Sequence, residues 1–497
     1  MTKADVAPHA VFRADWVLPG GGAAPIAGGA VAVDADGRIT AVGPAREVGR
    51  GAAAVEDLGR AILVPGLVNA HQHGRGISQL LMGYPDMPLE PWIAGRRRHG
   101  PPDIYAVTRL AAEAMLSNGV TATLHANYTY GSGDYEAELR AQIEAYRDAG
   151  LRATICVGLQ DRGALVYPDV AEAQAVARFP DAARDALRGP SPPAWMADFE
   201  AAADLMTRLQ RDYATSPLIG FAWGPAGPQW VRDETWRKVA SDAASRGVGV
   251  HFHLLESPAQ SAAAGRLYPD GTLAHLRRLG VFAGRTSCAH AVHMTQEDRT
   301  IAAGEGLVAV LNPGSNMRLF NGAPDVAALQ AAGVALAVGT DNCALSDTED
   351  LMSELRLAMA LGRAPVSRRA PETRAAPLAM VTETAARAAF LEAGSGILAP
   401  GAPADFAAFG LAEVTGGLPV DPARLEAVFV ARASGRDCRM AVVAGQVRFR
   451  AEASDRTRLG TWRGRAEASV AARSEILTED QIAALQAALL AHYGGQP

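Results

Sequence analysis

The chain has 497 residues, of which 49% are hydrophobic and 20% charged, and its formal net charge is −6 at pH 7. A chain of this length exceeds what one core usually fills, so we expect a large domain with a smaller one. The composition excludes a disordered or fibrous protein. The sequence has no run of about 18 apolar residues that would span a membrane, and its negative charge argues against a nucleic-acid or lipid partner.

The cysteines and the start of the chain bear on the compartment. Cys156, Cys288, Cys343 and Cys438 are far apart and show no paired spacing, so neither a disulfide framework nor a cysteine zinc site is expected. Residues 1–10 are polar and mixed, without the apolar segment of a signal peptide. We therefore expect a cytoplasmic protein.

Residues 1–63 predict the first part of a small β domain. Alternating stretches at 30–33 and 39–42 flank Asp36-Gly37-Arg38, a hairpin signal. Similar short apolar stretches recur within residues 391–450, which we assign to the second part of the same domain. Its predicted β segments are 404–409, 427–430 and 440–447. The two chain ends are thus expected to pair into one small β-sandwich domain.

Residues 64–390 alternate short apolar strands with amphipathic helices. The strands are predicted at 64–68, 119–124, 151–159, 217–223, 248–254, 286–290, 306–311 and 334–340. Helical stretches between them include 103–118, 135–148, 233–246 and 271–279. Eight βα units in series favour an α/β fold of the (β/α)₈ TIM-barrel type, with a doubly wound open sheet as the alternative.

Two insertions interrupt the alternation, at residues 75–102 and 160–215. Loops at the carboxyl ends of barrel strands carry substrate recognition, so each insertion fits either a lid or an oligomer contact. Residues 451–497 form a predicted helical tail. Within it Thr478-Glu479-Asp480-Gln481 is a capping box that opens a helix running through His492, which we expect to dock on the surface.

The first barrel strand delivers two histidines, His71 and His73. Residues two apart on a strand point to the same side, whereas Gln72 points to the other. Two neutral imidazoles that converge at a strand end suit a divalent metal such as zinc. Taken alone, such a pair is more often two surface histidines in a polar loop than a metal site.

Further metal-binding and proton-carrying side chains follow other predicted strands. His253 and Glu256 come at the end of the fifth strand, His290 ends the sixth and Asp341 follows the eighth. A single strand-end histidine or aspartate is as often structural as catalytic. All of them, however, fall at one rim of the predicted barrel, where barrel enzymes place their active sites. Together they predict a metal centre.

Several motifs resemble the amidohydrolase superfamily, in particular its guanine deaminase, S-adenosylhomocysteine deaminase and triazine hydrolase branch. They are PGLVNAHQHG (65–74), HLLE (253–256), AHAVHM (289–294), NPGSNMRL (312–319), GTDN (339–342) and GILAPGAPADF (396–406). The resemblance covers nearly the whole chain, and it is more specific for fold and metal chemistry than for substrate.

The resemblance implies that His71, His73, His253 and Asp341 bind one divalent metal ion per subunit, with zinc expected and iron or manganese as alternatives. It also implies that Glu256 shuttles protons and that His290 positions the attacking water, with Asp341 as a further proton acceptor. Binuclear members use a carboxylated lysine on the fourth strand. This chain has none there, its only lysines being Lys3 and Lys238, which favours one metal ion.

The reaction implied is hydrolytic deamination of an aminated nitrogen heterocycle of purine, pterin, pyrimidine or triazine type. The alternatives are displacement of halide, alkylamine or sulfide, or opening of a cyclic amide of imidazolone or hydantoin type. A catalytically silent ligand-binding barrel is the non-enzymatic alternative. We also expect a homodimer or larger homo-oligomer.

Other side chains near strand ends are candidates for holding a polar heterocycle by hydrogen bonds and stacking. These are His125, Gln79, Trp92, Gln160, Trp223 and Gln229. His293 is interpreted as structural. The Arg96–Arg98 run fits a contact to an acidic substrate, although a solvated charge run is the commoner meaning.

Overall fold

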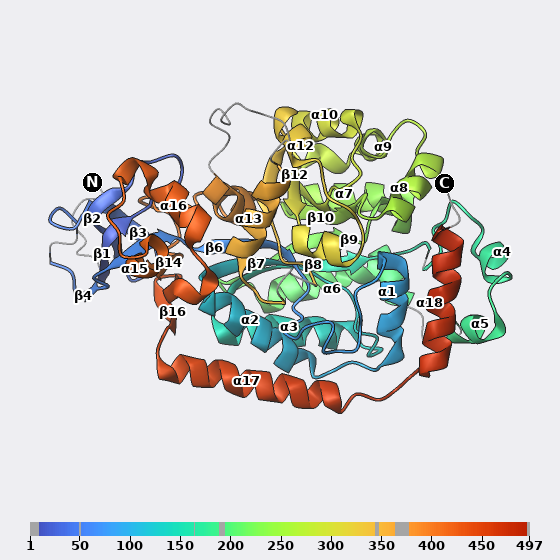
Figure 1. Cartoon of the computed structure of the whole chain (residues 1–497). Helices are drawn as coiled ribbons and strands as arrows, with labels where there is room; N and C mark the ends of the chain where they lie inside the picture. The colour runs from blue at the N-terminus through green and yellow to red at the C-terminus, as the bar shows by residue number, and fades with distance from the viewer. Residues whose placement is uncertain are drawn as a thin grey trace.

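The computed structural model describes residues 9–48, 51–163, 165–187, 194–342, 347–362 and 377–494. Cys343 lies outside these residues. So do residues 1–8, which include Lys3 and most of the segment predicted to lack a signal peptide. Within them the chain builds two β structures, the smaller at the left of the barrel in Figure 1. No helix in the described ranges combines the length and apolar character needed to cross a membrane.

One of the two eight-stranded sheets of the described chain is parallel throughout, and each of its strands pairs with the next in chain order. A bridge between Gln72 and Asp341 joins the first strand to the segment that follows the last, so the sheet closes into a barrel. The predicted (β/α)₈ barrel is confirmed. The strands are β6 (Leu67–Gln72), β7 (Val120–Ala126), β8 (Arg152–Leu159), β9 (Ile219–Pro225), β10 (Gly249–Leu254), β11 (Thr286–His290), β12 (Val308–Leu311) and β13 (Ala335–Val338).

The helices around the barrel form for local reasons that α3 (Tyr135–Ala149) illustrates. The Asp134 carboxylate accepts from the Ala137 N–H at its start, and Gly150 ends it with φ 76°. Its apolar residues recur at helical spacing and face the strands. The other outer helices are α2 (Ile104–Ser117), α6 (Phe199–Asp212), α7 (Asp233–Arg246), α9 (Thr272–Arg278), α10 (Gln296–Gly304), α12 (Val326–Ala331) and α13 (Leu351–Leu361).

The other sheet, which belongs to the small β domain and is called the small sheet below, takes its eight strands from both chain ends, as predicted. Its order is β16-β15-β14-β5-β1-β2-β3, and β4 pairs with β1. The two ends meet where β14 runs antiparallel to β5. The strands are β1 (Ala10–Val17), β2 (Ile26–Val33), β3 (Ile39–Pro44), β4 (Ala54–Asp57), β5 (Ala61–Pro65), β14 (Phe406–Gly410), β15 (Cys438–Val443) and β16 (Gln446–Arg450).

The predicted first strand, 64–68, was wrong as a single element. Val64 and Pro65 end β5 in the small sheet, whereas Leu67 begins β6 in the barrel. Proline cannot donate to a ladder, and at Gly66 the backbone passes so close to Thr121 that an added Cβ would lie 1.9 Å from its Oγ1. The chain therefore changes sheets at this Pro-Gly pair.

The predicted β segment at 427–430 was also wrong, because these residues lie in α16 (Leu425–Arg432). Leu425 and Phe429 are buried while Ala427 is exposed. Burial at positions four apart is the period of a helix, not a strand. A short apolar run did not reveal this period on its own.

Helix α14 (Glu383–Ala388) plugs the barrel at the amino-terminal ends of the strands. Its alanines pack against Val68 and other small residues of the barrel interior. Thr154 on β8 donates from Oγ1 to the carbonyl oxygen of Ala389 at 2.7 Å. The opposite end of the barrel, where the strands terminate, remains available for a site.

Both insertions and the tail meet beside that end. α1 (Leu89–Gly95), α5 (Asp181–Leu187) and α18 (Glu479–Gly494) share one apolar cluster, and Figure 1 shows α18 between the other two. The Thr478–Gln481 capping box is present, with Thr478 N–H donating to Gln481 Oε1 at 2.9 Å. The predicted second insertion was too long, since it contains α6, the barrel helix after β8. The remaining α-helices are α4 (Glu172–Val176), α8 (Pro258–Leu267), α11 (Pro313–Arg318), α15 (Leu411–Thr415) and the 19-residue α17 (Ala453–Ala471).

Candidate metal centre and active site

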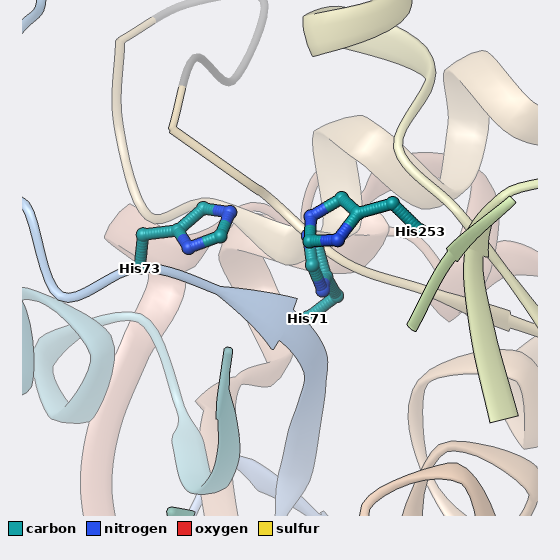
Figure 2. A group of neighbouring side chains, drawn as sticks. All are labelled: His71, His73 and His253. Atoms are coloured by element: carbon teal, nitrogen blue, oxygen red, sulfur yellow. The ribbon is translucent and has the colours of Figure 1, made fainter. Parts of the chain in front are cut away.

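Three histidines converge at the carboxyl ends of β6 and β10. The ligand nitrogens of His71, His73 and His253 lie within 4.8 Å of one another, and all three side chains are buried. Figure 2 shows their imidazoles gathered at the barrel mouth. The structure thus brings together the histidines that the sequence predicts as metal ligands.

Backbone carbonyls fix the tautomers of His73 and His253. His73 Nδ1 lies 2.6 Å from the carbonyl oxygen of Ala126, and His253 Nδ1 lies 3.0 Å from that of Ala226. A carbonyl oxygen only accepts, so each Nδ1 carries the proton. Each Nε2 therefore keeps a lone pair directed away from the backbone, as a metal ligand requires.

A longer chain of hydrogen bonds fixes His71. Ser287 Oγ donates to the carbonyl oxygen of Ala388 at 2.9 Å, so it accepts from His251 Nδ1 at 2.7 Å. His251 Nε2 is then an acceptor for His71 Nδ1–H, at 2.8 Å. This leaves the lone pair of His71 on Nε2. The chain runs from the plug helix to the metal-binding face of His71, entirely through buried groups.

Asp341 lies at the point where the barrel closes. Its N–H donates to the carbonyl oxygen of His71 at 3.0 Å, which places its carboxylate beside the histidines. Oδ1 is 3.0 Å from His73 Nε2 and 3.5 Å from His71 Nε2, while Oδ2 accepts from Ser315 Oγ at 2.5 Å. Burial by itself raises the pKa of Asp341, but the adjacent His71 and His73 side chains bring it well below its usual value.

These residues fit a divalent cation. The buried Nε2 of His71 has no hydrogen-bond partner among the described residues, although it faces a carboxylate. Burial lowers the pKa of His71 to about 4 and also lowers the pKa values of His73 and His253, so the imidazoles are neutral and able to ligate. Lys238 lies outside the barrel on α7, where it pairs with Glu200.

Glu256 and His290 face one another beside this ligand set. His290 Nε2 is 3.5 Å from Glu256 Oε2 and 3.9 Å from Asp341 Oδ2. Asn316 Oδ1 accepts from His290 Nδ1 at 2.8 Å, and Asn321 Nδ2 donates to Glu256 Oε1 at 3.0 Å. Burial raises the pKa of Glu256 to about 7 against the opposing effect of His290. A carboxyl group with this pKa exchanges protons near neutral pH.

The backbone is strained at these same positions. His290 has φ 75° and Asp341 has φ 53°, with Leu255 and Ala291 also in the left-handed region. For residues other than glycine this conformation costs roughly 1–3 kcal/mol each and persists where surrounding structure imposes it, often at functional sites. The backbone at these strand ends therefore adopts a strained conformation that directs the side chains of His290 and Asp341 toward the site.

A cavity of about 320 Å³ opens over the centre, and His73, His253, His290, Glu256 and Asp341 contribute to its lining. Of the six residues predicted to contact substrate, Trp92 and Gln160 line it and the other four do not. The Nε2 of Gln160 also donates to the Gly163 carbonyl oxygen at 3.2 Å.

The four remaining candidates lie behind the cavity wall. Because Leu124 and Ala126 face the barrel interior, His125 points outward, and its Nδ1 is 2.8 Å from the Tyr146 hydroxyl. Trp223 also points outward and donates to Asp242 Oδ2 at 2.8 Å. Gln79 and Gln229 are buried without lining the cavity. His293, interpreted as structural, contacts the Asn321 carbonyl oxygen at 2.9 Å.

Sequence reasoning missed the residues that hold the catalytic groups in place. From the sequence, no role was assigned to His251, Ser315, Asn316 or Asn321. The last three lie on or just after α11, which follows β12. The run of small polar residues directly after β12 marks this segment as a candidate, but it does not show which catalytic groups these side chains contact.

Comparisons with known proteins agree with this geometry. A profile described as the amidohydrolase family matches residues 62–448. A 5-methylthioadenosine/S-adenosylhomocysteine deaminase of Nitratidesulfovibrio vulgaris is 30% identical over 436 residues, which cover 85% of this chain and 87% of that protein. A 5'-deoxyadenosine deaminase of Methanosarcina barkeri is 28% identical and is matched over 66% of this chain and 67% of its own length.

A solved structure of an adenosine deaminase from Xanthomonas campestris with bound zinc has a TM-score of 0.74 and 27% identity. The match covers 93% of this chain and 99% of that one. The resemblance seen in the motifs is thereby confirmed over most of the length. This chain belongs to the amidohydrolase family, whose members are hydrolases acting on carbon–nitrogen bonds.

Proposed function

We propose that this protein is a metal-dependent deaminase of an aminated nitrogen heterocycle of purine, pterin, pyrimidine or triazine type. The observation that carries the proposal is the buried Glu256–His290 pair beside the ligand set, 3.5 Å apart and open to one cavity. Relatives named as adenosine-type deaminases support the class of reaction. We further propose zinc as the metal, since a zinc-bound relative shares the fold.

His71, His73, His253 and Asp341 would hold one ion. When bound, a divalent cation makes a water molecule acidic enough to attack near neutral pH. His290 keeps its Nε2 lone pair because its Nδ1–H is donated to Asn316, so Nε2 can orient that water and accept a proton from it. Asp341 Oδ2, held by Ser315, offers a second acceptor on the same side.

Glu256 supplies the proton that the ring requires. Asn321 holds Oε1, which leaves Oε2 turned toward His290 and the cavity. In its protonated form Glu256 donates to the ring nitrogen next to the attacked carbon, because that nitrogen gains electron density as the carbon becomes tetrahedral. Asp341 or the now ionised Glu256 accepts the second proton of the attacking water and passes it to the amine. The C–N bond then breaks, the amine leaves as ammonia, and the proton first accepted by His290 restores protonated Glu256.

A substrate panel tests the reaction type. Amino-purines, adenosine derivatives, amino-pterins, amino-pyrimidines and amino-triazines are incubated with the zinc-loaded protein, and ammonia, halide, sulfide and ring opening are measured separately. Ammonia release from at least one class is expected. If no member releases ammonia while another leaving group appears, the protein is a hydrolase of that other type and the deaminase proposal is wrong.

The Glu256→Gln variant tests the proton carrier. Glutamine keeps the oxygen that accepts from Asn321 but cannot donate a carboxyl proton, so turnover should fall by about 10²–10⁴-fold with an unchanged metal content. Glu113→Gln is a matched control, since Glu113 is another buried carboxyl group and accepts from Arg109 and Arg458 outside the cavity lining. Loss of metal from Glu256→Gln would make Glu256 a ligand and refute its assigned role.

We also propose a cytoplasmic homodimer or larger homo-oligomer. Light scattering of the purified protein tests the assembly, and a monomer at micromolar concentration would refute it. Recovery of activity with the cytoplasmic fraction of the source cells would support the location, and recovery with another fraction would refute it.

A further inference from the structure

The cavity over the metal centre has a second, cationic end. Four arginines contribute to its lining, and the only described carboxylate of the lining outside the metal centre is Glu172. They are Arg75, Arg96, Arg97 and Arg473. This concentration is unusual for a chain whose net charge is −6, and a neutral heterocycle gives no reason for it.

Arg75 carries most of this argument. It follows His73 by two residues, and only 6% of it is exposed. Its Nε donates to the amide oxygen of Asn342 at 2.6 Å, and its guanidinium lies 4.5 Å from the ring centre of Tyr130. Neither partner carries a charge, and no carboxylate of the described residues lies within ion-pair distance of it. A buried charge without a counterion is costly.

Arg473 approaches the cavity from the C-terminal tail, between α17 and α18. Its Nη1 donates to the Tyr84 hydroxyl at 2.9 Å and its Nη2 to the Met82 carbonyl oxygen at 2.9 Å. These bonds to neutral oxygens position the guanidinium without neutralising it. The C-terminal tail therefore adds a fixed positive charge to a cavity whose other lining residues include those of the loops after the barrel strands.

The other two arginines come from the predicted Arg96–Arg98 run, at the 3-10 turn after α1. Arg96 lies 5.2 Å from the ring centre of Trp92, and Arg97 is close enough to Glu172 for the two charges to interact. The first two residues of this run therefore face the cavity, whereas Arg98 pairs with Glu475 at 3.1 Å. A run of charged residues is most commonly solvated surface, and this interpretation fits only part of the Arg96–Arg98 run.

We propose that the substrate carries an anionic substituent, a carboxylate or a phosphate, and that Arg75 binds it with Arg473 and the Arg96–Arg97 turn around it. The planar guanidinium forms paired, charge-assisted hydrogen bonds with both of these groups. The inference rests on the proposed deaminase function for the other end of the substrate. It defines the substrate as a two-part molecule, with an aminated ring toward Glu256 and an anion toward Arg75.

Matched pairs of compounds test this. The pairs are adenosine and adenosine 5'-monophosphate, and pterin and pterin-6-carboxylate, so that phosphate and carboxylate are separate arms. In at least one pair the anionic member is expected to have a kcat/KM at least tenfold above its neutral partner. Equal or better turnover of the neutral member in every pair would overturn the proposal.

Variants assign the effect to the arginines. Arg75→Gln should raise KM for the anionic member by at least tenfold and leave the neutral member within about threefold, and Arg473→Gln should do the same more weakly. Arg439→Gln is the control, because Arg439 on β15 pairs with Glu413 on α15 and neither residue lines the cavity. Equal losses for both members of a pair would show that Arg75 only supports the fold, and so would contradict the assignment.

A binding measurement separates this proposal from the proposed reaction. Calorimetric titration of the same pairs into zinc-loaded Glu256→Gln protein reports affinity without turnover. Tighter binding of an anionic member, abolished by Arg75→Gln, would support the anion site even if no compound released ammonia, in which case the deaminase proposal alone would fail. Equal affinity within every pair would overturn the anion site and leave the reaction to be judged by ammonia release.

Discussion

The hydroxyl of Ser287 should control metal affinity although it is not itself a ligand. Ser287→Ala removes the acceptor for His251 Nδ1–H and the donor to the Ala388 carbonyl. His251 can then carry its proton on Nε2, facing His71 Nδ1. In that arrangement His71 places its own proton on Nε2, where it blocks the lone pair that a metal ion needs.

Two separate losses follow from this variant. Each buried polar group left without a partner costs about 1–3 kcal/mol of stability. Loss of a residue that orients a metal ligand typically lowers metal affinity by about 10–100-fold, which corresponds to about 1.4–2.8 kcal/mol. The first loss is measured by urea denaturation of the metal-free protein, and the second by competition for zinc with a chromophoric chelator at constant pH.

Thr154→Val provides the matched control. Thr154 also donates to a carbonyl of the plug region, that of Ala389 at 2.7 Å, and it is buried, but it is not hydrogen-bonded to a histidine in the structure. It should lose stability and keep its zinc affinity. If Ser287→Ala behaves in the same way, the hydroxyl serves only to hold α14, and the tautomer argument for His71 is refuted.

Three further predictions follow from the geometry. Because the pKa of Glu256 is raised to about 7, its proton-donating form is lost as the pH rises, so kcat/KM should decline about tenfold per pH unit well above 7, and an unchanged rate between pH 7 and 9 would contradict its role as acid. Chelation should lower the free energy of unfolding by roughly 2.7 kcal/mol relative to protein with zinc at 100 times its Kd. If elemental analysis finds less than half an equivalent of metal in the purified protein, and His73→Ala does not change that content, a catalytically silent barrel is favoured instead. Gly66→Ala should destabilise the fold by about 1–3 kcal/mol through overpacking against Thr121, and adding Thr121→Ala should restore part of that stability in urea denaturation. An unchanged urea midpoint for Gly66→Ala alone would show that the junction between β5 and β6 can shift.

The fold was largely predictable because its local signals agree with one another. Apolar strands of four to eight residues, separated by segments of helical period, determine a parallel barrel almost by connectivity alone. The same regularity placed His71, His73, His253, His290 and Asp341 at one rim. The predictions at 64–68 and 427–430 failed because a short apolar run is too short to show whether it has the period of a helix or of a strand, or which sheet it joins.

The candidate substrate residues were less predictable, since proximity to a strand end does not determine which way a side chain points. Strict alternation along β7 and β9 would have placed His125 and Trp223 on the outer face, toward α3 and α7. The supporting roles of His251, Asn316 and Asn321 depend on contacts between segments distant in the chain. No pattern within one segment contains that information.

The closure of the barrel coincides with the metal centre, because the Asp341 N–H bonds to the carbonyl of His71 while both side chains face the same ion site. A bound cation would therefore cross-link the first and last barrel strands. It could be captured only after nearly all of the barrel has been synthesised and closed, since contacts this distant in sequence form late. Metal loading would then act as a check on folding, because a chain with an open seam lacks one of the four ligands.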